Sequence, residues 1–97
     1  MINPKSFYDH LTSHSDFITG VPDSLLKEFN ACLLNEHPKN KHIIAPNEGT
    51  SIGLAIGNYI STGKVPTVYM QNSGIGNAVN PLMSLADKDV YGVPMLV

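Results

Sequence analysis

The stretch Gln71-Asn72-Ser73-Gly74-Ile75-Gly76-Asn77-Ala78-Val79-Asn80 decides the fold, together with the shorter stretch Asn47-Glu48-Gly49 upstream. Each stretch follows an apolar segment typical of a buried strand and opens a segment with helical periodicity. Both therefore mark points where a strand of a parallel sheet gives way to a helix. Ligands of open α/β sheets bind outside that edge of the sheet.

The rest of the chain repeats this rhythm of strand, loop and helix. Strands are predicted at residues 16–19, 42–45, 65–70 and 93–97, and helices at residues 4–14, 24–33, 49–61 and 75–86. Asn3 followed by Pro4 is a helix-start signal, and Gly63 is a helix-stop signal. Such alternation implies right-handed parallel crossovers. The fold class is therefore predicted to be α/β, a parallel sheet with flanking helices.

Composition describes one ordinary globular unit and excludes several classes of partner. The chain has 97 residues, a formal net charge of −2 and 42% hydrophobic residues. All six basic residues are lysines, and no basic stripe is present for a nucleic-acid backbone. Neither a targeting segment nor a run long enough to span a bilayer is seen, so a cytoplasmic location is expected. The apolar end, residues 93–97, reads as a strand without a following turn, which favours a fragment truncated at its C-terminal end.

Three residues that could carry chemistry have ordinary structural interpretations. Cys32 is expected to be a buried structural thiol, because it belongs to an apolar helical pattern formed by Leu25, Leu26, Phe29, Cys32 and Leu33. As the single cysteine it cannot form a disulfide within the chain, which fits a reducing compartment. His10 and His14 have the i, i+4 spacing that can pair on a metal, but no carboxylate or thiol completes such a site. A solvated helix face is expected there, and no metal is assigned to this chain.

The helix predicted at residues 49–61 has two faces that are each expected to pack against another element. Gly49, Gly53 and Gly57 recur at a spacing of four, although glycine within a helix costs about 1 kcal/mol relative to alanine. A close approach to this glycine face by another element is therefore expected. The other side carries the apolar stripe Ile52, Ala55, Ile56, Tyr59 and Ile60, which can cover the sheet. The element on the glycine face is either a second domain or subunit, or the chain's own sheet.

Glu48 is the strongest candidate for chemistry. It stands at the start of a helix, where free backbone N–H groups and the helix dipole stabilise a carboxylate. The alternative is a first-turn glutamate with no further role. In the second stretch, Gly74 and Gly76 allow a ligand to approach the backbone at a helix N-terminus. The third glycine of a dinucleotide fingerprint would fall at Val79, so the fingerprint fails.

Taken in order, Gly20-Val21-Pro22-Asp23-Ser24, Asn47-Glu48-Gly49 and residues 71–78 resemble the pyrimidine-binding domain of thiamine-diphosphate-dependent 2-oxo acid decarboxylases. Within that group, residues 63–74 and 77–82 look most like the phosphonopyruvate decarboxylases. The resemblance runs from about residue 17 to residue 97. It implies that residues 1–97 are the N-terminal part of a pyrimidine-binding domain and that the diphosphate-binding domain is absent from this chain.

The resemblance also implies roles for individual residues. Glu48 matches the catalytic glutamate that hydrogen-bonds N1′ of the cofactor's aminopyrimidine ring and promotes its change of tautomer. Cofactor-binding candidates are Glu48, Gln71, Gly74, Gly76 and Asn77, and substrate-binding candidates are Asp23, Ser24, Asn72 and Ser73. Helix capping is the structural alternative for Asp23 and Ser24. Met70 stands near the place where some related decarboxylases have a catalytic histidine, so proton transfer by histidine from this loop is not expected.

The activity implied by the resemblance is that of a carboxy-lyase. It would convert 3-phosphonopyruvate into phosphonoacetaldehyde and CO₂ with thiamine diphosphate, and this chain would be inactive alone. A separate diphosphate-binding domain or subunit would hold the diphosphate and Mg²⁺, and the complete enzyme is expected to be a homo-oligomer. Two alternatives stay open: the pyrimidine-binding subunit of a sulfopyruvate decarboxylase, and a non-catalytic α/β interaction module. Because arginine is absent, contacts to a substrate anion would come from backbone N–H groups, lysines or the remainder of the enzyme.

Overall fold

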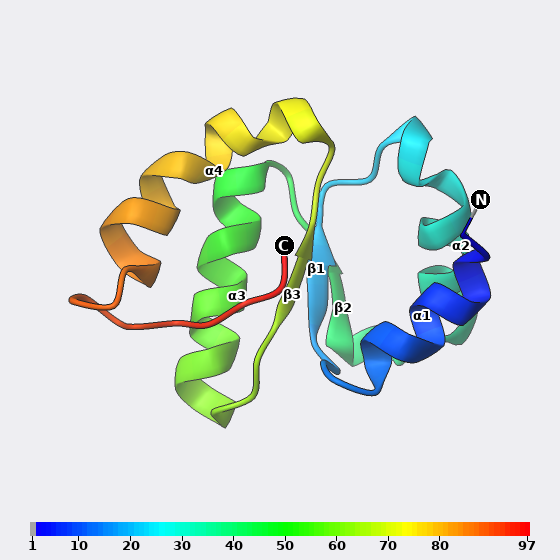
Figure 1. The fold of residues 1–97 in the computed structure, drawn as a ribbon, viewed down its shortest axis with the longest axis horizontal. Coiled ribbons are helices and arrows are strands. Elements are labelled where there is room, and N and C mark those ends of the chain that lie inside the picture. The colour runs from blue at the N-terminus through cyan, green and yellow to red at the C-terminus, as the bar shows by residue number, and fades with distance from the viewer. Residues whose placement is uncertain (1) are drawn as a thin grey trace.

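The computed structural model describes residues 2–97 and shows a three-stranded parallel sheet between two layers of helices (Figure 1). The strands are β1 (Ile18–Gly20), β2 (His42–Ile44) and β3 (Thr67–Tyr69). On one face lie α1 (Pro4–Thr12) and α2 (Lys27–Glu36), and on the other lie α3 (Glu48–Thr62) and α4 (Ile75–Pro81). Short helical turns complete the chain: η1 (Ser24–Leu26), η2 (Lys39–Lys41), η3 (Asn72–Gly74) and the π-helical η4 (Leu82–Ala86). The predicted fold class is confirmed.

The strand order β2-β1-β3 makes the chain reverse its direction of travel across the sheet. From β1 the chain runs through α2 to β2, and from β2 it returns through α3 to β3 on the other side of β1. The loops after β1 and β3 therefore leave the same edge toward opposite faces. Gly20, the last residue of β1, is level with Ile44 and Tyr69. A crevice between such diverging loops is where open α/β sheets bind ligands.

Each face of the sheet is packed by its own apolar cluster. Against α3 and α4 the buried residues are Ile52, Ala55, Ile56, Val68, Ala78 and Val93, and against α1 and α2 they are Tyr8, Ile18, Leu33 and Tyr69. Two residues predicted to be on apolar faces are instead exposed, Ile60 at 61% and Leu25 at 88%. Ile60 lies at the margin of its stripe. Leu25 lies in the 3₁₀ turn η1, where the α-helical spacing behind the prediction does not hold.

Several predicted boundaries shift for identifiable reasons. Asn3 caps α1 by accepting from the backbone N–H of Ser6, but the helix ends at Thr12 instead of residue 14. The helix predicted at residues 75–86 is α-helical only as far as Pro81 and continues as the π-helical turn η4, since proline has no N–H to donate to the α-helical ladder. The strand predicted at residues 93–97 forms one bridge, between Leu96 and Thr67. Pro94 has no N–H for a longer ladder.

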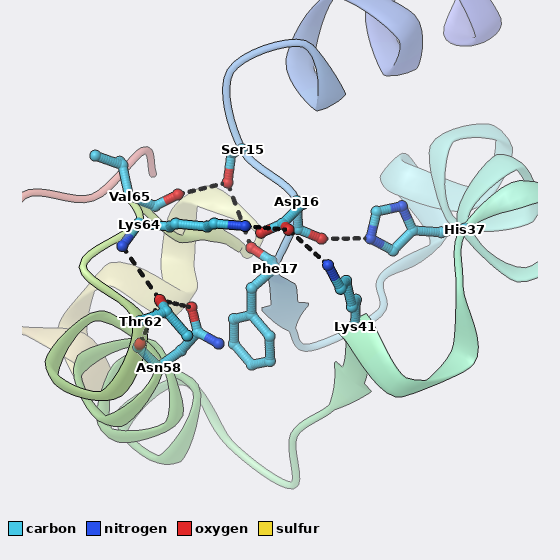
Figure 2. Close-up of polar contacts among 9 residues, drawn as sticks. All are labelled: Ser15, Asp16, Phe17, His37, Lys41, Asn58, Thr62, Lys64 and Val65. Atoms are coloured by element: carbon cyan, nitrogen blue, oxygen red, sulfur yellow. Dashed lines mark hydrogen bonds and ion pairs between the residues drawn. The ribbon is translucent and has the colours of Figure 1, made fainter.

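A polar cluster holds the amino ends of the three strands together (Figure 2). Asp16, which precedes β1, accepts a hydrogen bond from Lys41 at 2.7 Å, and its Oδ2 lies 3.5 Å from Nζ of Lys64. Lys41 and Lys64 precede β2 and β3. The hydrogen bond from Lys41 lowers the pKa of Asp16. The cluster also includes His37, whose Nε2–H donates to the backbone carbonyl of Asp16 at 2.6 Å. These contacts lie at the edge of the sheet opposite the loops that follow the strands.

Candidate functional site

Glu48 begins α3 and points its carboxylate at the N-terminus of α4. Asn47 caps α3 by accepting from the backbone N–H of Thr50 at 2.9 Å. The Glu48 side chain is buried, and its Oε2 accepts a hydrogen bond from Nδ2 of Asn77 at 3.0 Å. Within residues 2–97, Oε1 forms no hydrogen bond, and it is not among the fully enclosed polar atoms. One oxygen of a sheltered carboxylate is thus held by the protein while the other is available to a ligand.

Gly74 provides the space that this carboxylate occupies. A Cβ atom at residue 74 would lie 2.6 Å from Oε1 of Glu48 and 2.8 Å from its Cγ. Such distances are well inside van der Waals contact, so any larger residue at position 74 would displace the Glu48 side chain. At Gly76 a Cβ would meet no atom of the described residues within 4 Å. Gly74 is therefore required to make room for Glu48, whereas the space beside Gly76 is unoccupied by the described residues.

The three glycines of α3 have different surroundings. A Cβ at Gly49 would lie 3.1 Å from the carbonyl oxygen of Asn77, so that glycine serves the close packing of α4 on α3. At Gly53 and Gly57 no atom of residues 2–97 lies within 4 Å of that position. These two border an open hollow of about 550 Å³ that also involves Phe17 and Ile43. The alternative prediction, that the whole glycine face packs tightly against the chain's own sheet, is therefore wrong.

Two of the four substrate-binding candidates line a groove that runs along β3. Ser24 and Asn72 line an apolar groove of about 1120 Å³ between the α1–α2 layer and β3, and Gln71 lines it as well. Asp23 uses its Oδ2 to accept from the backbone N–H of Leu25 at 2.9 Å, which is the capping role given above as its alternative. Ser73 is exposed. No hydrogen bond among the described residues links Asp23 or Ser24 to Glu48, so the structure gathers Glu48, Gly74 and Asn77 but not the full predicted set.

Two features of the site were not anticipated from the sequence. The first is the Asn77–Glu48 hydrogen bond, since Asn77 was assigned to the cofactor alone. The second is Gly20, where a Cβ would lie 2.1 Å from the carbonyl oxygen of Tyr69. Gly20 is thus required for the close approach of β1 and β3 at the carboxyl edge. Its position at the end of an apolar segment and before Val-Pro was the available signal for a tight turn.

Other candidate chemistry is not supported by geometry. His10 on α1 and His14 just beyond its end are both exposed, and their rings pack edge to face with centroids 5.1 Å apart. Across residues 2–97, no group of three or more His, Cys, Asp and Glu side chains is arranged to hold a metal ion. Cys32 is half-buried instead of fully buried, at the border of the cluster under α1 and α2. Within the described chain, no helix combines the length and apolar character needed to cross a membrane.

Comparison with known proteins assigns this arrangement to a family. Residues 5–97 match the family described as thiamine pyrophosphate enzyme, N-terminal TPP binding domain; thiamine pyrophosphate is another name for thiamine diphosphate. The chain is 38% identical over 87 residues to the sulfopyruvate decarboxylase subunit alpha of Methanococcus maripaludis, covering 90% of this chain and 50% of that protein.

Two further relatives with the same name come from other organisms. The subunit of Methanocaldococcus jannaschii is 43% identical over 74 residues, covering 75% of this chain and 42% of the relative. That of Methanothermobacter thermautotrophicus is 34% identical over 80 residues, covering 82% and 46%. The chain thus spans about half the length of the curated relatives it matches. Since the family match extends over almost the entire sequence, this chain belongs to the thiamine pyrophosphate enzymes, as their N-terminal TPP binding domain.

Proposed function

We propose that this chain supplies the pyrimidine-binding part of a thiamine-diphosphate-dependent decarboxylase of sulfopyruvate. The observation that carries the proposal is the Glu48 carboxylate, sheltered at a helix start with Oε2 held by Asn77 and Oε1 free of partners within residues 2–97. Three relatives that cover most of this chain are named sulfopyruvate decarboxylase subunit alpha. The phosphonate substrate implied by the sequence resemblance becomes the second candidate.

The residues present fit one end of the cofactor. A carboxyl oxygen without a protein partner can share a proton with a ring nitrogen such as N1′, and the open Gly76 leaves the neighbouring backbone approachable. The charged end of the cofactor has no counterpart here, since residues 2–97 contain neither a metal-binding cluster nor an arginine. We assign the diphosphate and Mg²⁺ to a diphosphate-binding domain or partner subunit. When bound, thiamine diphosphate supplies the carbon nucleophile and accepts the electron pair that the departing CO₂ leaves behind.

The part played by this chain is proton handling and exclusion of water. With the cofactor bound, Glu48 would hydrogen-bond N1′ through Oε1 and would exchange a proton there, and the N-terminus of α3 would stabilise the ionised carboxylate. Burial of most of the Glu48 side chain limits the access of water, and because Oε1 is not fully enclosed, a bound cofactor would complete the shielding of this oxygen. In the overall reaction the bond between the carboxylate and the keto carbon breaks, CO₂ leaves, and a proton takes its place to give an aldehyde.

The small number of cationic side chains near the site favours a sulfonate substrate over a phosphonate. A phosphonate can carry two negative charges and a sulfonate carries one, so the sulfonate requires fewer cationic contacts. The chain has no arginine, and Lys41 and Lys64 are paired with Asp16 at the opposite edge of the sheet (Figure 2). Lys5 is paired with Asp9 and Glu36. The other three lysines form no ion pair among residues 2–97, and one of them, Lys27, lines the apolar groove, so the described residues offer one cation there to a substrate anion.

The test compares both substrates on the complete enzyme, assembled with its diphosphate-binding part, thiamine diphosphate and Mg²⁺. We expect CO₂ release from sulfopyruvate at a kcat/KM at least tenfold above that from 3-phosphonopyruvate. Glu48→Gln should abolish most of the CO₂ release from sulfopyruvate, whereas Glu36→Gln, at an exposed position outside the site, should retain it. The reverse preference would restore the phosphonate assignment. Absence of CO₂ release from either acid, with bound cofactor verified, would favour the non-catalytic module.

A further inference from the structure

We infer that Asn77 is a positioning residue for Glu48 and that Gly74 is the space the positioned side chain needs. In this arrangement Asn77 holds Oε2, which fixes the plane of the carboxylate and presents Oε1 to the cofactor. The inference rests on the proposed function, because it explains how the carboxyl group assigned to the cofactor is oriented. It concerns contacts within this chain, so part of it can be tested without any ligand.

The hydrogen bond has a defined direction. An ionised carboxylate only accepts, so the amide of Asn77 must turn its NH₂ group toward Glu48, as the 3.0 Å contact between Nδ2 and Oε2 requires. A hydrogen bond to an ionised acceptor is roughly twice as strong as one between neutral groups. A glutamate side chain has three rotatable bonds, so such an anchor on one oxygen removes most of the freedom of the other.

The donor stands on a firmly packed element. Asn77 lies in the first turn of α4, and its neighbour Ala78 is fully buried in the cluster between α3 and the sheet. The carbonyl of Asn77 packs at 3.1 Å from the Cβ position of Gly49, the residue that follows Glu48. Backbone packing and the side-chain hydrogen bond therefore join the same two helix starts. This places the donor with the precision that a proton-transfer group needs, since misplacement by about 1 Å can cost 10²-fold in rate.

Gly74 completes the arrangement from the other side. The Glu48 carboxylate fills the volume where a Cβ would stand, 2.6 Å from Oε1. A methyl group there would force the side chain away from Asn77 or away from the cofactor. The flexible end of Glu48 can move aside, so the variant Gly74→Ala can fold while losing the orientation. Gly76→Ala is the matched control for the fold, because no described atom lies within 4 Å of that position.

The first experiment measures decarboxylation by the complete enzyme in the wild type, Glu48→Gln, Asn77→Ala and the double variant, each saturated with cofactor. We expect Asn77→Ala to lower kcat by about 10- to 100-fold, less than the 10²–10⁴-fold expected for Glu48→Gln. Because Asn77 acts through Glu48, the double variant should be no slower than Glu48→Gln alone. A double variant in which the two losses multiply would overturn the inference. Asn35→Ala, at an exposed position on α2 with no described partner, controls for the loss of a helix asparagine.

The second experiment uses the complete protein without cofactor and follows the side-chain amide of Asn77 by NMR with ¹⁵N-labelled asparagine. A charge-assisted bond should shift one of its two amide protons downfield, and both Glu48→Gln and Gly74→Ala should move that signal. Gly76→Ala should leave it in place. If the chemical shift of this amide proton is unchanged in Glu48→Gln, the inference is overturned whatever the activity of the enzyme. If instead the signal responds but Glu48→Gln decarboxylates at the wild-type rate, the proposed role of Glu48 fails while its contact with Asn77 stands.

Discussion

The hydroxyl of Tyr69 lies 2.9 Å from Nε2 of His42, which joins the two strands that do not pair with each other. Tyr69 is on β3 and His42 on β2, with β1 between them. The tyrosine ring lies close to Gly20, where a Cβ would come within 2.7 Å of Cδ2. Glycine at that position therefore permits the contact across β1. Just beyond Gly20, the backbone N–H of Val21 donates to the carbonyl oxygen of Tyr69 at 3.2 Å, so β3 also holds the start of the loop that leads to Asp23.

The first prediction concerns the alkaline stability of this contact. Burial raises the pKa of Tyr69 to about 12 from an ordinary value of 10.0. Between these values the unfolded chain loses the proton while the folded chain keeps it, so the stability that comes from the neutral hydroxyl falls as the pH rises. At pH 7, the free energy of unfolding of Tyr69→Phe should be about 1 kcal/mol lower than that of the wild type, because the hydrogen bond is lost. Urea titrations should show this difference shrinking above pH 10; a difference that stays constant to pH 12 would contradict the burial of the hydroxyl.

The second prediction concerns the catalytic role proposed for Glu48. Glu48→Gln keeps the size of the side chain but cannot exchange a proton with N1′, so activation of the bound cofactor should slow by about 10²–10⁴-fold. The measurement is the exchange rate of the C2 proton of bound thiamine diphosphate in the complete enzyme, with cofactor occupancy determined in both proteins. Equal exchange rates would make Glu48 an ordinary first-turn glutamate.

The third prediction concerns assembly through the open part of the glycine face. Gly53 has no described atom within 4 Å of its Cβ position, so Gly53→Leu should leave the stability of the chain unchanged or higher, given the better helix propensity of leucine. If a second domain or subunit approaches this face, the same change should weaken association at least tenfold, as measured by sedimentation. Ala31→Leu, an exposed position on α2 at the opposite face, is the control for added bulk. Loss of fold and association in equal measure would instead indicate packing within the chain.

The fourth prediction concerns the cluster at the amino ends of the strands. The hydrogen bond from Lys41 lowers the pKa of Asp16 below its ordinary value of 3.8. The charged form of Asp16 therefore stabilises the fold above that value, and this contribution disappears as the pH falls through the lowered pKa. Because the pair is partly exposed, Asp16→Asn should cost no more than about 1 kcal/mol at pH 7, and the cost should shrink as the pH falls below 3.8. Asp89→Asn, at an exposed position without an ion pair among residues 2–97, should show no such pH dependence; a similar dependence there would remove the assignment to the Lys41 pair.

The sequence by itself determined the order of strands and helices and their parallel arrangement, because those properties are encoded within a few neighbouring residues. Asn3 and Gly63 act at the helix ends where the sequence predicts them. The same local signals placed Glu48 at the start of a helix after a strand. They also predicted that the Glu48 and Gly74 loops would share one edge, which the contact between these residues confirms.

Only the tertiary structure decided which of these residues meet. Glu48 and Asn77 are 29 positions apart, and their hydrogen bond depends on how α4 packs against α3. The need for glycine at positions 20 and 74, and the open surroundings of Gly53, likewise depend on neighbours that are distant in the sequence. Periodicity states which side of a helix is apolar, but the depth of burial depends on how far the sheet and the facing helix extend. For that reason Ile60 and Leu25, apolar in pattern, are exposed in the fold.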